Sequence, residues 1–291
     1  MNVRLRVRHL DLGQTLGCGQ TFRWEELGPG VWRGPIGDAL VTLRTEGGWL
    51  RADSTPEVPD LRRRVFEYLR LGDDTDRVVR ELSKDPVMRR GIESVSGLRL
   101  VKMDEWECLA SYVLATFTNI ERIKKMIERL STRYGDPITE DVRAFPSVDR
   151  LAEASVRDLE SLGLGYRAKY LAKVCDAVDD GRLDRMRRMP DDELRKELLT
   201  LSGVGDKVAD CVSLFGFGRL TAFPIDVWME RALMRLYAEK GSYRRLREFA
   251  SARFGDLAGY AQEYLYYNER VLSCAGGCVF TRPGGSSCRT P

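Results

Sequence analysis

The spacing of apolar residues changes once along the chain. Before Pro59, apolar and polar residues alternate, as Val3, Leu5 and Val7 do between arginines. Alternation of this kind is typical of half-buried strands. Similar segments follow at residues 21–24, 31–33, 40–43 and 49–51, with a Gly47-Gly48 turn before the last of them. Together these segments predict an antiparallel sheet.

From Pro59 to Leu272 apolar residues recur every three to four positions, as in helices that pack on one face. Asp104 and Asn119 each precede such a segment and are expected N-caps. We therefore predict an α+β fold, with an N-terminal antiparallel β-sheet domain followed by an all-helical two-lobed body that contains a helix-hairpin-helix motif. The expected divisions are residues 1–100 for the sheet domain with its flanking helices, 101–200 for a helical domain, 201–272 for the hairpin and the C-terminal helices, and 273–291 for a mobile tail.

One stretch of the helical part contains a tight turn. Residues 191–199 form a short predicted helix opened by Pro190, and Gly203-Val204-Gly205 interrupts the pattern before a second helix begins at Asp206. Glycines let the backbone approach another molecule closely, and the amides that open a helix attract phosphate. The hairpin therefore predicts contacts from Gly203 and Gly205 to a nucleic-acid backbone, without readout of its sequence.

Two residues give this hairpin candidate chemistry. Lys207 falls in the first turn of the second helix, near the positive end of its dipole and beside apolar neighbours, which favours a neutral, nucleophilic amine. Asp226 opens the next helix and can face the lysine across the turn. An amine that attacks a sugar carbon and a carboxylate that stabilises an oxocarbenium-like charge suffice to cut an N-glycosidic bond. Taken singly, the lysine is better explained as a solvated charge and the aspartate as an N-cap, and it is their occurrence together in one hairpin that favours the catalytic interpretation.

Composition narrows the possible chemistry. The 291 residues carry a formal net charge of +3, too small by itself to indicate a nucleic-acid partner. His9 is the single histidine and lies in the alternating segment, so neither a Ser-His-Asp triad nor a histidine-rich metal site is expected. The seven cysteines are scattered, which fits a reducing compartment. With no signal peptide and no apolar run near the ~20 residues of a membrane span, we expect a soluble intracellular protein.

The hairpin resembles a known family. It contains the pattern Leu201-x-Gly203-Val204-Gly205-x-Lys207-Val208-Ala209-Asp210-Cys211, followed by Pro224-x-Asp226-Val227. This pattern is similar to the helix-hairpin-helix DNA glycosylases, and among them to the 8-oxoguanine DNA glycosylases. The resemblance implies that Lys207 is a Schiff-base nucleophile and Asp226 an essential carboxylate. It also implies a bifunctional enzyme that excises the base and then nicks the strand by β-elimination, without a metal or organic cofactor.

Four further residues match positions that contact the base in that family. Gly19 opens Gly19-Gln20-Thr21-Phe22-Arg23-Trp24, similar to the family's Gly-Gln-Ser-Phe-Arg-Trp, and its carbonyl would accept N7–H of 8-oxoguanine. Gln262 and Tyr266 share a helix face and match the glutamine on the base's pairing edge and the stacking aromatic residue, usually Phe. Cys211 would cover the other face of the purine. Without the resemblance, Gly19 is equally a turn glycine, and an amphipathic core helix explains Tyr266 but not a buried glutamine.

Other matches imply contacts with a distorted duplex from which one base has been flipped out. Tyr166 matches a residue that wedges into the base stack, and Arg167 and Arg122 match arginines that contact the unpaired cytosine. On sequence alone, a core tyrosine and two solvated arginines explain these residues about as well. Trp228 stands where the family commonly has a histidine that faces phosphate.

The chain departs from the family before the helix that begins at Ile120. The family usually has three asparagines there, the first of which fills the space left by the base. Here the three residues are Phe117, Thr118 and Asn119, so only Asn119 matches. Either Phe117 fills the space as an apolar wedge, or it is a core residue and Tyr166 acts alone. Preference for cytosine opposite the lesion is therefore left open.

Two other functions remain open at this point. A helix-hairpin-helix glycosylase of different specificity, such as an alkylated-base enzyme, resembles the same fold but usually lacks the hairpin lysine. A non-catalytic module that binds damaged DNA would leave the lesion intact. The tail cysteines lack the four-cysteine iron–sulfur loop of the endonuclease III branch and are interpreted as unstructured: Cys274, Cys278 and Cys288. The expected partner is double-stranded DNA that contains 8-oxoguanine, with no membrane, and we expect a monomer.

Overall fold

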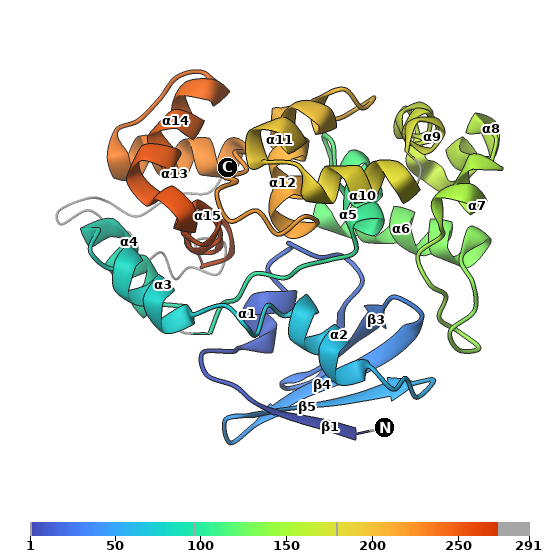
Figure 1. The fold of residues 1–291 in the computed structure, drawn as a ribbon, viewed down its shortest axis with the longest axis horizontal. Coiled ribbons are helices and arrows are strands. Elements are labelled where there is room, and N and C mark those ends of the chain that lie inside the picture. The colour runs from blue at the N-terminus through green and yellow to red at the C-terminus, as the bar shows by residue number, and fades with distance from the viewer. Residues whose placement is uncertain (1, 96, 179, 273–291) are drawn as a thin grey trace.

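The structure, a computed structural model, describes residues 2–95, 97–178 and 180–272. Its N-terminal part is a five-stranded antiparallel sheet with the strand order β1-β5-β4-β3-β2 (Figure 1). The strands are β1 (Asn2–Arg6), β2 (Glu25–Gly28), β3 (Val31–Ile36), β4 (Ala39–Glu46) and β5 (Trp49–Thr55). The predicted antiparallel sheet is confirmed.

One predicted strand, residues 21–24, does not form. Thr21, Phe22 and Trp24 are all buried, so this segment is not a half-buried strand with one solvent-exposed face. Its polar groups bond to a helix instead of a neighbouring strand: Tyr68 Oη accepts a hydrogen bond from Trp24 Nε1 at 2.8 Å and lies 2.9 Å from Thr21 Oγ1. The segment therefore anchors the loop that contains Gly19 to the sheet domain.

The sheet buries one face against two short helices. Along β4 the side chains alternate between buried and partly exposed, with Val41 and Leu43 fully buried. α1 (Leu12–Leu16) and α2 (Leu61–Tyr68) pack against the sheet on the side that faces the helical body (Figure 1). Burial of this apolar face is what holds the sheet to the rest of the molecule.

The remaining chain is helical. Its elements are α3 (Thr75–Leu82), α4 (Pro86–Glu93), α5 (Glu105–Leu114), α6 (Ile120–Tyr134), α7 (Val148–Ala152), α8 (Val156–Leu159), η1 (Glu160–Leu164), α9 (Arg167–Ala177), α10 (Asp180–Arg188), α11 (Asp191–Leu199), α12 (Asp206–Phe215), α13 (Val227–Tyr237), α14 (Tyr243–Phe254), η2 (Gly255–Leu257), α15 (Ala258–Tyr266) and η3 (Tyr267–Leu272). Asp104 and Asn119 cap α5 and α6 through their side chains, as predicted.

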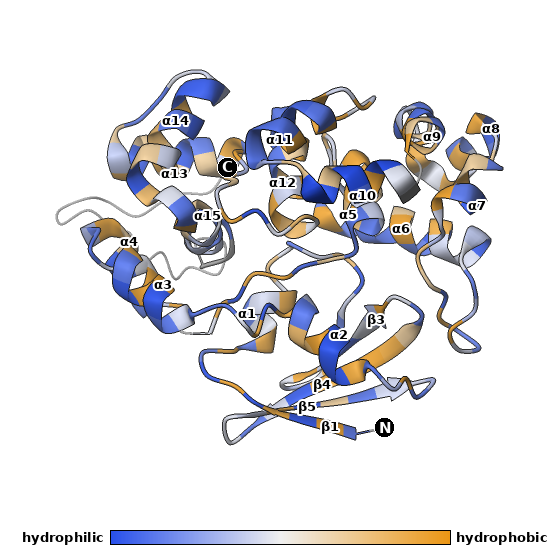
Figure 2. Cartoon of the chain, in the orientation of Figure 1, coloured by the Kyte–Doolittle hydropathy of each residue, from blue (hydrophilic) through white to orange (hydrophobic). Residues whose placement is uncertain are grey.

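The helices form two lobes above the sheet. α3, α4 and α13–α15 lie on one side in Figure 1, α6–α9 lie on the other, and α5, α11 and α12 lie between them. Most outer helices carry both polar and apolar residues, as α3 and α4 do in Figure 2. α5 is different because every residue from Glu105 to Leu114 except Glu107 is buried. It packs against α12, with the rings of Tyr112 and Phe215 stacked at 5.8 Å.

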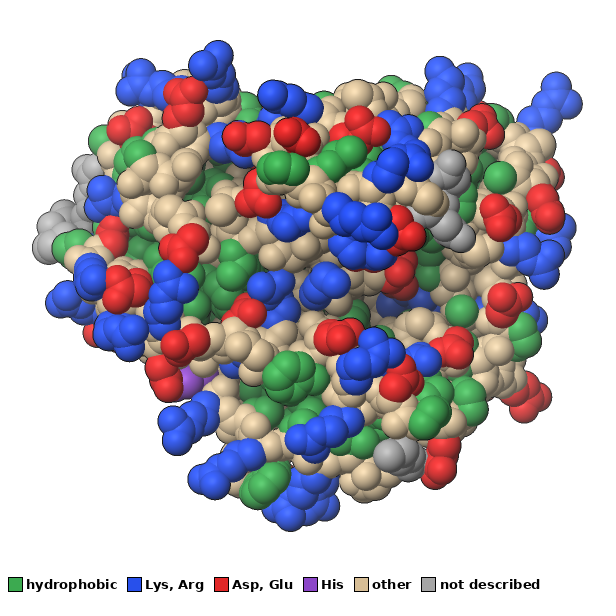
Figure 3. Space-filling view, in the orientation of Figure 1, with side chains coloured by type: hydrophobic (Ala, Val, Ile, Leu, Met, Phe, Trp, Pro, Cys, Tyr) green, Lys and Arg blue, Asp and Glu red, His purple; other side chains and the backbone are tan. Residues whose placement is uncertain are grey.

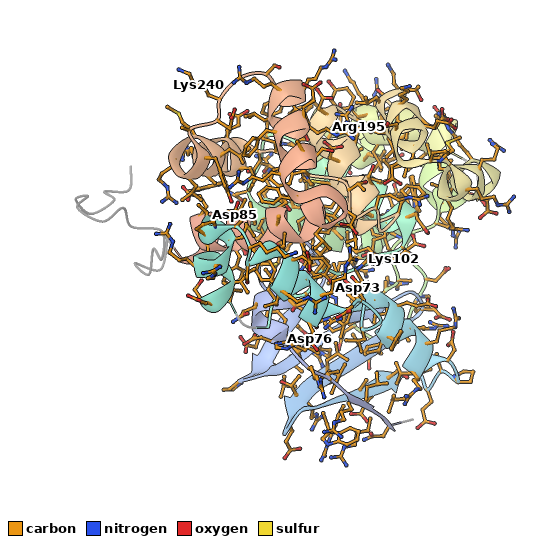
Figure 4. All side chains as sticks on the ribbon, turned by 60° about the vertical axis from the view of Figure 1, so that its left-hand side comes forward. Asp73, Asp76, Asp85, Lys102, Arg195 and Lys240 are labelled. Atoms are coloured by element: carbon orange, nitrogen blue, oxygen red, sulfur yellow. The ribbon has the colours of Figure 1, made fainter. Side chains whose placement is uncertain are left out.

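Polar contacts fix the C-terminal helices to the segment that follows the sheet. Asp73 Oδ2 accepts hydrogen bonds from Tyr260 Oη on α15 and Arg70 Nε, both at 2.7 Å, and Asp85 pairs with Arg253 on α14. Asp73 and Asp85 are labelled in Figure 4. The bond to Asp73, which lies 187 residues before Tyr260 in the chain, fixes the position of α15. It thereby positions the residues that α15 contributes to the site.

The face of the molecule shown in Figure 3 has no continuous stripe of one charge. Figure 3 shows Lys and Arg interspersed with Asp and Glu there, in keeping with the small net charge. Within the described residues, no helix is long and apolar enough to cross a membrane, and no group of three or more His, Cys, Asp or Glu side chains is arranged to hold a metal ion. The predicted mobile tail, with Cys274, Cys278 and Cys288, lies outside the described residues.

Candidate active site

The helix-hairpin-helix forms where the sequence predicts it. α11 ends at Leu199, Gly203 turns the chain with φ of +79°, and α12 begins at Asp206. A Cβ on Gly203 would come within 2.8 Å of the Tyr170 side chain on α9. Glycine is therefore required both by the left-handed backbone and by the close packing of the turn on α9.

The buried carboxylate of Asp210 stabilises the packing of the hairpin. Asp210 on α12 is fully buried and accepts hydrogen bonds from Arg195 Nε on α11 at 2.8 Å and from Tyr243 Oη on α14 at 2.7 Å. Arg195, labelled in Figure 4, also pairs with Asp206 at the start of α12. Because a buried carboxylate is tolerated only with its partners in place, these contacts hold α11, α12 and α14 in one arrangement.

Lys207 lines a narrow pocket from the first turn of α12. Its Nζ lies 5.0 Å from the centre of the Tyr112 ring on α5. One turn further along, burial raises the pKa of the Cys211 thiol to about 12, although the positive charge of Lys207 acts in the opposite direction. The thiol is therefore neutral at physiological pH and forms a soft apolar wall beside the amine.

Asp226 has two roles in the structure. It is the N-cap of α13, where its Oδ1 accepts hydrogen bonds from the amides of Trp228 and Met229, both at 3.0 Å. It also lines the same pocket as Lys207. Because both capping bonds end on one carboxylate oxygen, the cap leaves acceptor capacity on the other.

All six residues predicted for catalysis and base contact line this one pocket, although distant parts of the chain supply them. They are Gly19 from the loop after α1, Lys207 and Cys211 from α12, Asp226 from the start of α13, and Gln262 and Tyr266 from α15. The space between them is about 50 Å³, room for one or two water molecules. The pocket opens into a wider groove, with which it shares Gly19, Tyr112, Lys207, Asp226 and Tyr266.

Gly19 is both a turn residue and a wall of the pocket. Its φ is +103°, and a Cβ there would lie 2.3 Å from Ile120 Cδ1 on α6. The carbonyl of the preceding residue, Cys18, accepts a hydrogen bond from Arg270 Nη1 on η3 at 3.1 Å. The glycine therefore lies between α6 and the C-terminal helices, and a side chain there would displace the tip of Ile120.

The pocket also contains residues that the sequence analysis does not single out. They are Gln20, Tyr112, Phe215, Pro224 and Glu263. Periodicity predicts that Tyr112 and Phe215 are buried, but it does not separate a residue that faces a pocket from one in the core. Glu263 is different, because a charged residue in a helix that is mostly apolar and aromatic is a signal in the sequence itself.

The pocket adjoins a wider groove of about 950 Å³, and several predicted DNA contacts line it. These are Asn119, Tyr166, Gly203, Gly205 and Trp228. Asn119 Oδ1 also accepts the Arg122 amide at 2.9 Å, so this side chain serves as the cap of α6. Arg122 is exposed on α6 but does not line the groove.

Phe117 stands at the groove and is not a core residue. Its side chain is 96% exposed, and its backbone adopts φ of +48°, which is unfavourable for a side chain of this size. A large apolar side chain held in water on a strained backbone points to a function for that side chain. Of the two interpretations of Phe117, the structure excludes the core residue.

Arg167 and Tyr166 support the loop that carries Phe117. Arg167 is only 3% exposed, and it donates hydrogen bonds from Nε to the Thr116 carbonyl at 3.0 Å and from Nη2 to the Phe117 carbonyl at 3.1 Å. It is therefore not a solvated arginine. Tyr166 is about half exposed, so the core interpretation of this residue is wrong, and its Oη donates to Thr116 at 3.2 Å. A contact between Arg167 and a DNA base would require these loop bonds to be exchanged.

Comparison with known proteins identifies the family. Residues 2–109 match the model of the 8-oxoguanine DNA glycosylase N-terminal domain, and residues 110–255 match that of the HhH-GPD superfamily of base excision DNA repair proteins. The chain is 30% identical to the N-glycosylase/DNA lyase OGG1 of Arabidopsis thaliana, over 92% of this chain and 79% of the relative.

Two solved structures have the same fold. One is MBOgg1 in complex with a low-affinity DNA ligand, with 36% identity, a TM-score of 0.89 and coverage of 93% of this chain and 96% of that one. The other is the Clostridium acetobutylicum 8-oxoguanine glycosylase/lyase with double-stranded DNA that contains cytosine opposite 8-oxoguanine, with 31% identity, a TM-score of 0.86 and coverage of 93% and 98%. The chain belongs to the 8-oxoguanine DNA glycosylase family of the HhH-GPD superfamily.

Proposed function

We propose that this protein is a bifunctional DNA glycosylase and AP lyase that excises 8-oxoguanine from duplex DNA. The observation that carries the proposal is the pocket in which Lys207 and Asp226 meet Gly19, Cys211, Gln262 and Tyr266. The relatives named above as N-glycosylase/DNA lyase and 8-oxoguanine glycosylase/lyase support the same reaction. Its setting is wherever the cell keeps its DNA, the cytoplasm or nucleoid, or the nucleus in a eukaryote.

The reaction begins at the sugar of a flipped nucleotide. The Lys207 amine attacks C1′ in its deprotonated form, a C–N bond forms, and the N-glycosidic bond breaks with its electron pair leaving on the base. The Asp226 carboxylate stabilises the positive charge that develops on the sugar. One proton passes from the attached nitrogen to the departing base, and O4′ takes a proton from water as the C1′–O4′ bond breaks, which leaves a protonated Schiff base. Water then removes a proton from C2′, and the C3′–O bond breaks with its electron pair leaving on the 3′-phosphate, which nicks the strand. None of these steps requires a metal or an organic cofactor.

The walls of the pocket supply recognition of the base. In this proposal the Gly19 carbonyl accepts N7–H of 8-oxoguanine, a hydrogen that guanine lacks, and Gln262 bonds to the pairing edge. Tyr266 and Cys211 cover the two faces of the purine. All four residues line the pocket beside Lys207. Discrimination by hydrogen bonds in a water-poor pocket is strong, because the wrong base leaves polar groups unpaired.

The groove holds the duplex open. The amides near Gly203 and Gly205 bind a phosphate at the start of α12, and Trp228 and Arg122 add contacts to the backbone or the unpaired base. Phe117 and Tyr166 fill the space that the flipped base leaves. Arg167 holds the loop that carries Phe117 through its hydrogen bonds to the Thr116 and Phe117 carbonyls. We expect one protein molecule per lesion.

The direct test is an excision assay on duplexes that contain 8-oxoguanine opposite each of the four bases. We expect release of 8-oxoguanine, followed by strand cleavage, with at least one opposing base. A duplex with an alkylated base is the control for the alternative specificity. Excision of that base instead of 8-oxoguanine would support an alkylated-base enzyme, and binding without release of any base would support a non-catalytic module.

We expect Gly19→Ala to slow excision of 8-oxoguanine on the order of 10²-fold, because a shift of about 1 Å in a positioning group costs this much. The tip of the Ile120 side chain, 2.3 Å from the added Cβ, can rotate away, but a backbone with φ of +103° is strained for alanine, so we expect the backbone and with it the Gly19 carbonyl to shift. Single-turnover excision measures the effect. Gly28→Ala is the matched control, since nothing lies within 4 Å of its added Cβ. Equal rates for Gly19→Ala and the control would refute the role of Gly19.

We expect Phe117→Ala to lower excision from duplex DNA by about 10- to 100-fold, because an apolar wedge offsets the few kcal/mol needed to unstack a base. The melting temperature should stay unchanged, since the side chain is 96% exposed. Phe117→Asn, which restores the family's residue and tolerates the left-handed backbone, should retain more activity than Phe117→Ala. Fluorescence of 2-aminopurine next to the lesion reports unstacking. Wild-type excision and unstacking in Phe117→Ala would exclude the wedge.

A further inference from the structure

Glu263 is the one acidic side chain of α15, and the proposed reaction does not use it. It follows Gln262 in the helix, it is only 2% exposed, and it lines the base pocket. Burial of a carboxylate is unfavourable unless the carboxylate is paired, so the position of Glu263 has to be explained by a partner.

No cation in the described part of the chain forms an ion pair with Glu263. Its Oε1 accepts no hydrogen bond from any described residue, and the same is true of the neighbouring Gln262 Oε1. Two acceptor oxygens, from consecutive residues that both line one small pocket, are thus left without donors. Because buried polar atoms are nearly always satisfied in native proteins, a pair of unsatisfied acceptors indicates a ligand that brings the donors.

The surroundings of Glu263 explain its ionisation. Burial raises the pKa of the Glu263 carboxyl to about 7, the negative charge of Asp226 acts in the same direction, and the Cys18 thiol and Arg270 act against it. The titratable and charged groups around it are Cys18 before Gly19, Tyr112 on α5, Lys207 and Cys211 on α12, Asp226 at the start of α13, Tyr266 on α15 and Arg270 on η3. The carboxyl therefore changes charge close to neutral pH.

We propose that Glu263 is a further specificity-determining residue of the base pocket, and that its Oε1 accepts a hydrogen bond from an N–H of the flipped base beside the N–H taken by Gln262. The proposal rests on the function proposed above. A guanine-type pairing edge presents two donors, the ring N1–H and the exocyclic amine, one for each of the two unpartnered acceptors in the pocket. An adenine-type edge presents a ring acceptor beside its amine, which would face one of the two oxygens and repel it.

The first test separates recognition of the base from the chemistry of Lys207. Glu263→Met keeps the length of the side chain and removes its acceptors. We expect single-turnover excision of 8-oxoguanine to fall at least tenfold, whereas borohydride trapping on a duplex with a preformed abasic site stays within twofold of wild type, because no base is read there. Leu265→Met, on the same helix but outside the pocket, is the matched control and should keep both activities.

Stability gives a readout that does not depend on activity. A carboxyl whose pKa is higher in the folded than in the unfolded state destabilises the fold as pH rises from its unfolded value of about 4.5 to about 7. The melting temperature of Glu263→Met relative to wild type should therefore rise between pH 5 and pH 7. A glutamate whose carboxylate is stabilised by partners within the fold predicts the reverse, a relative melting temperature that falls between pH 5 and pH 7, and that result would overturn the proposal.

A second variant covers the case in which Glu263→Met does not fold. Glu263→Gln keeps the shape but cannot ionise. In wild type, the ratio of 8-oxoguanine excision to abasic-site trapping should rise as pH passes through about 7, because the carboxylate accepts hydrogen bonds more strongly than the acid. In Glu263→Gln the ratio should be flat. A flat or falling ratio in wild type, or loss of abasic-site trapping in either folded variant, would overturn the proposal.

The two proposals fail in different ways. If wild type releases no 8-oxoguanine from any duplex, the proposed function fails, whatever Glu263 does. If wild type excises 8-oxoguanine and folded Glu263→Met excises it at the same rate, only the role of Glu263 fails.

Discussion

Replacement of Lys207 by Gln is expected to abolish covalent attachment to DNA and to lower 8-oxoguanine excision by at least ~10³-fold, because a carboxamide has no lone pair free to attack C1′. Gln is nearly as good a helix former as Lys, and the first turn of α12 does not depend on the amine for a cap. The melting temperature should therefore stay close to that of wild type. Single-turnover excision and borohydride trapping measure the two losses.

Lys102→Gln is the control for this experiment. Lys102, labelled in Figure 4, is partly exposed and lies outside the pocket. It should leave both activities within twofold. If Lys207→Gln still became covalently attached to damaged DNA under reduction, the nucleophile would have to be another residue.

Replacement of Asp226 by Asn is expected to lower excision by about 10²- to 10³-fold, the usual loss when one preorganised electrostatic group is removed from an active site. The substitution removes the negative charge but keeps an oxygen that can accept the Trp228 and Met229 amides, so α13 should remain capped. The expected result is a folded protein with little activity. Excision rate and thermal melting, measured together, distinguish loss of charge from loss of fold.

Asp74→Asn is the matched control for charge at a cap. Asp74 caps α3 by accepting the Arg77 amide at 2.8 Å and lies far from the pocket in the chain and outside its lining. Its replacement should not change the excision rate. An Asp226→Asn variant with wild-type rate would reduce Asp226 to an N-cap alone.

The sequence predicted the hairpin and the sheet because both depend on local signals. Gly203 needs a left-handed backbone, Asp104 and Asn119 are caps, and alternation marks the strands, so neighbouring residues suffice to recognise them. The convergence of Gly19, Lys207 and Gln262 in one pocket depends on contacts across the whole chain, and periodicity carries no information about these. The expectation that these residues share one site comes from the resemblance to a family.

The sequence does not predict the exposure or the hydrogen-bond partners of individual side chains. The sequence alone does not decide whether Phe117 is a core residue or a wedge, because an aromatic residue at a loop is compatible with both. The exposure of Phe117 depends on the hydrogen bonds from Arg167 to the loop carbonyls. Segment 21–24 alternates like a strand, but its hydrogen bonds go to Tyr68. Tertiary contacts overrode the local pattern in both places.

The bond between Lys207 and the sugar is the central step of the proposed reaction. Its most direct test is to reduce a reaction of wild-type protein and an 8-oxoguanine duplex with borohydride, digest the adduct, and locate the modified residue by mass spectrometry. We predict a single DNA-derived mass on the peptide that contains Lys207. An adduct on any other residue, or no adduct in a reaction that releases 8-oxoguanine, would contradict the mechanism.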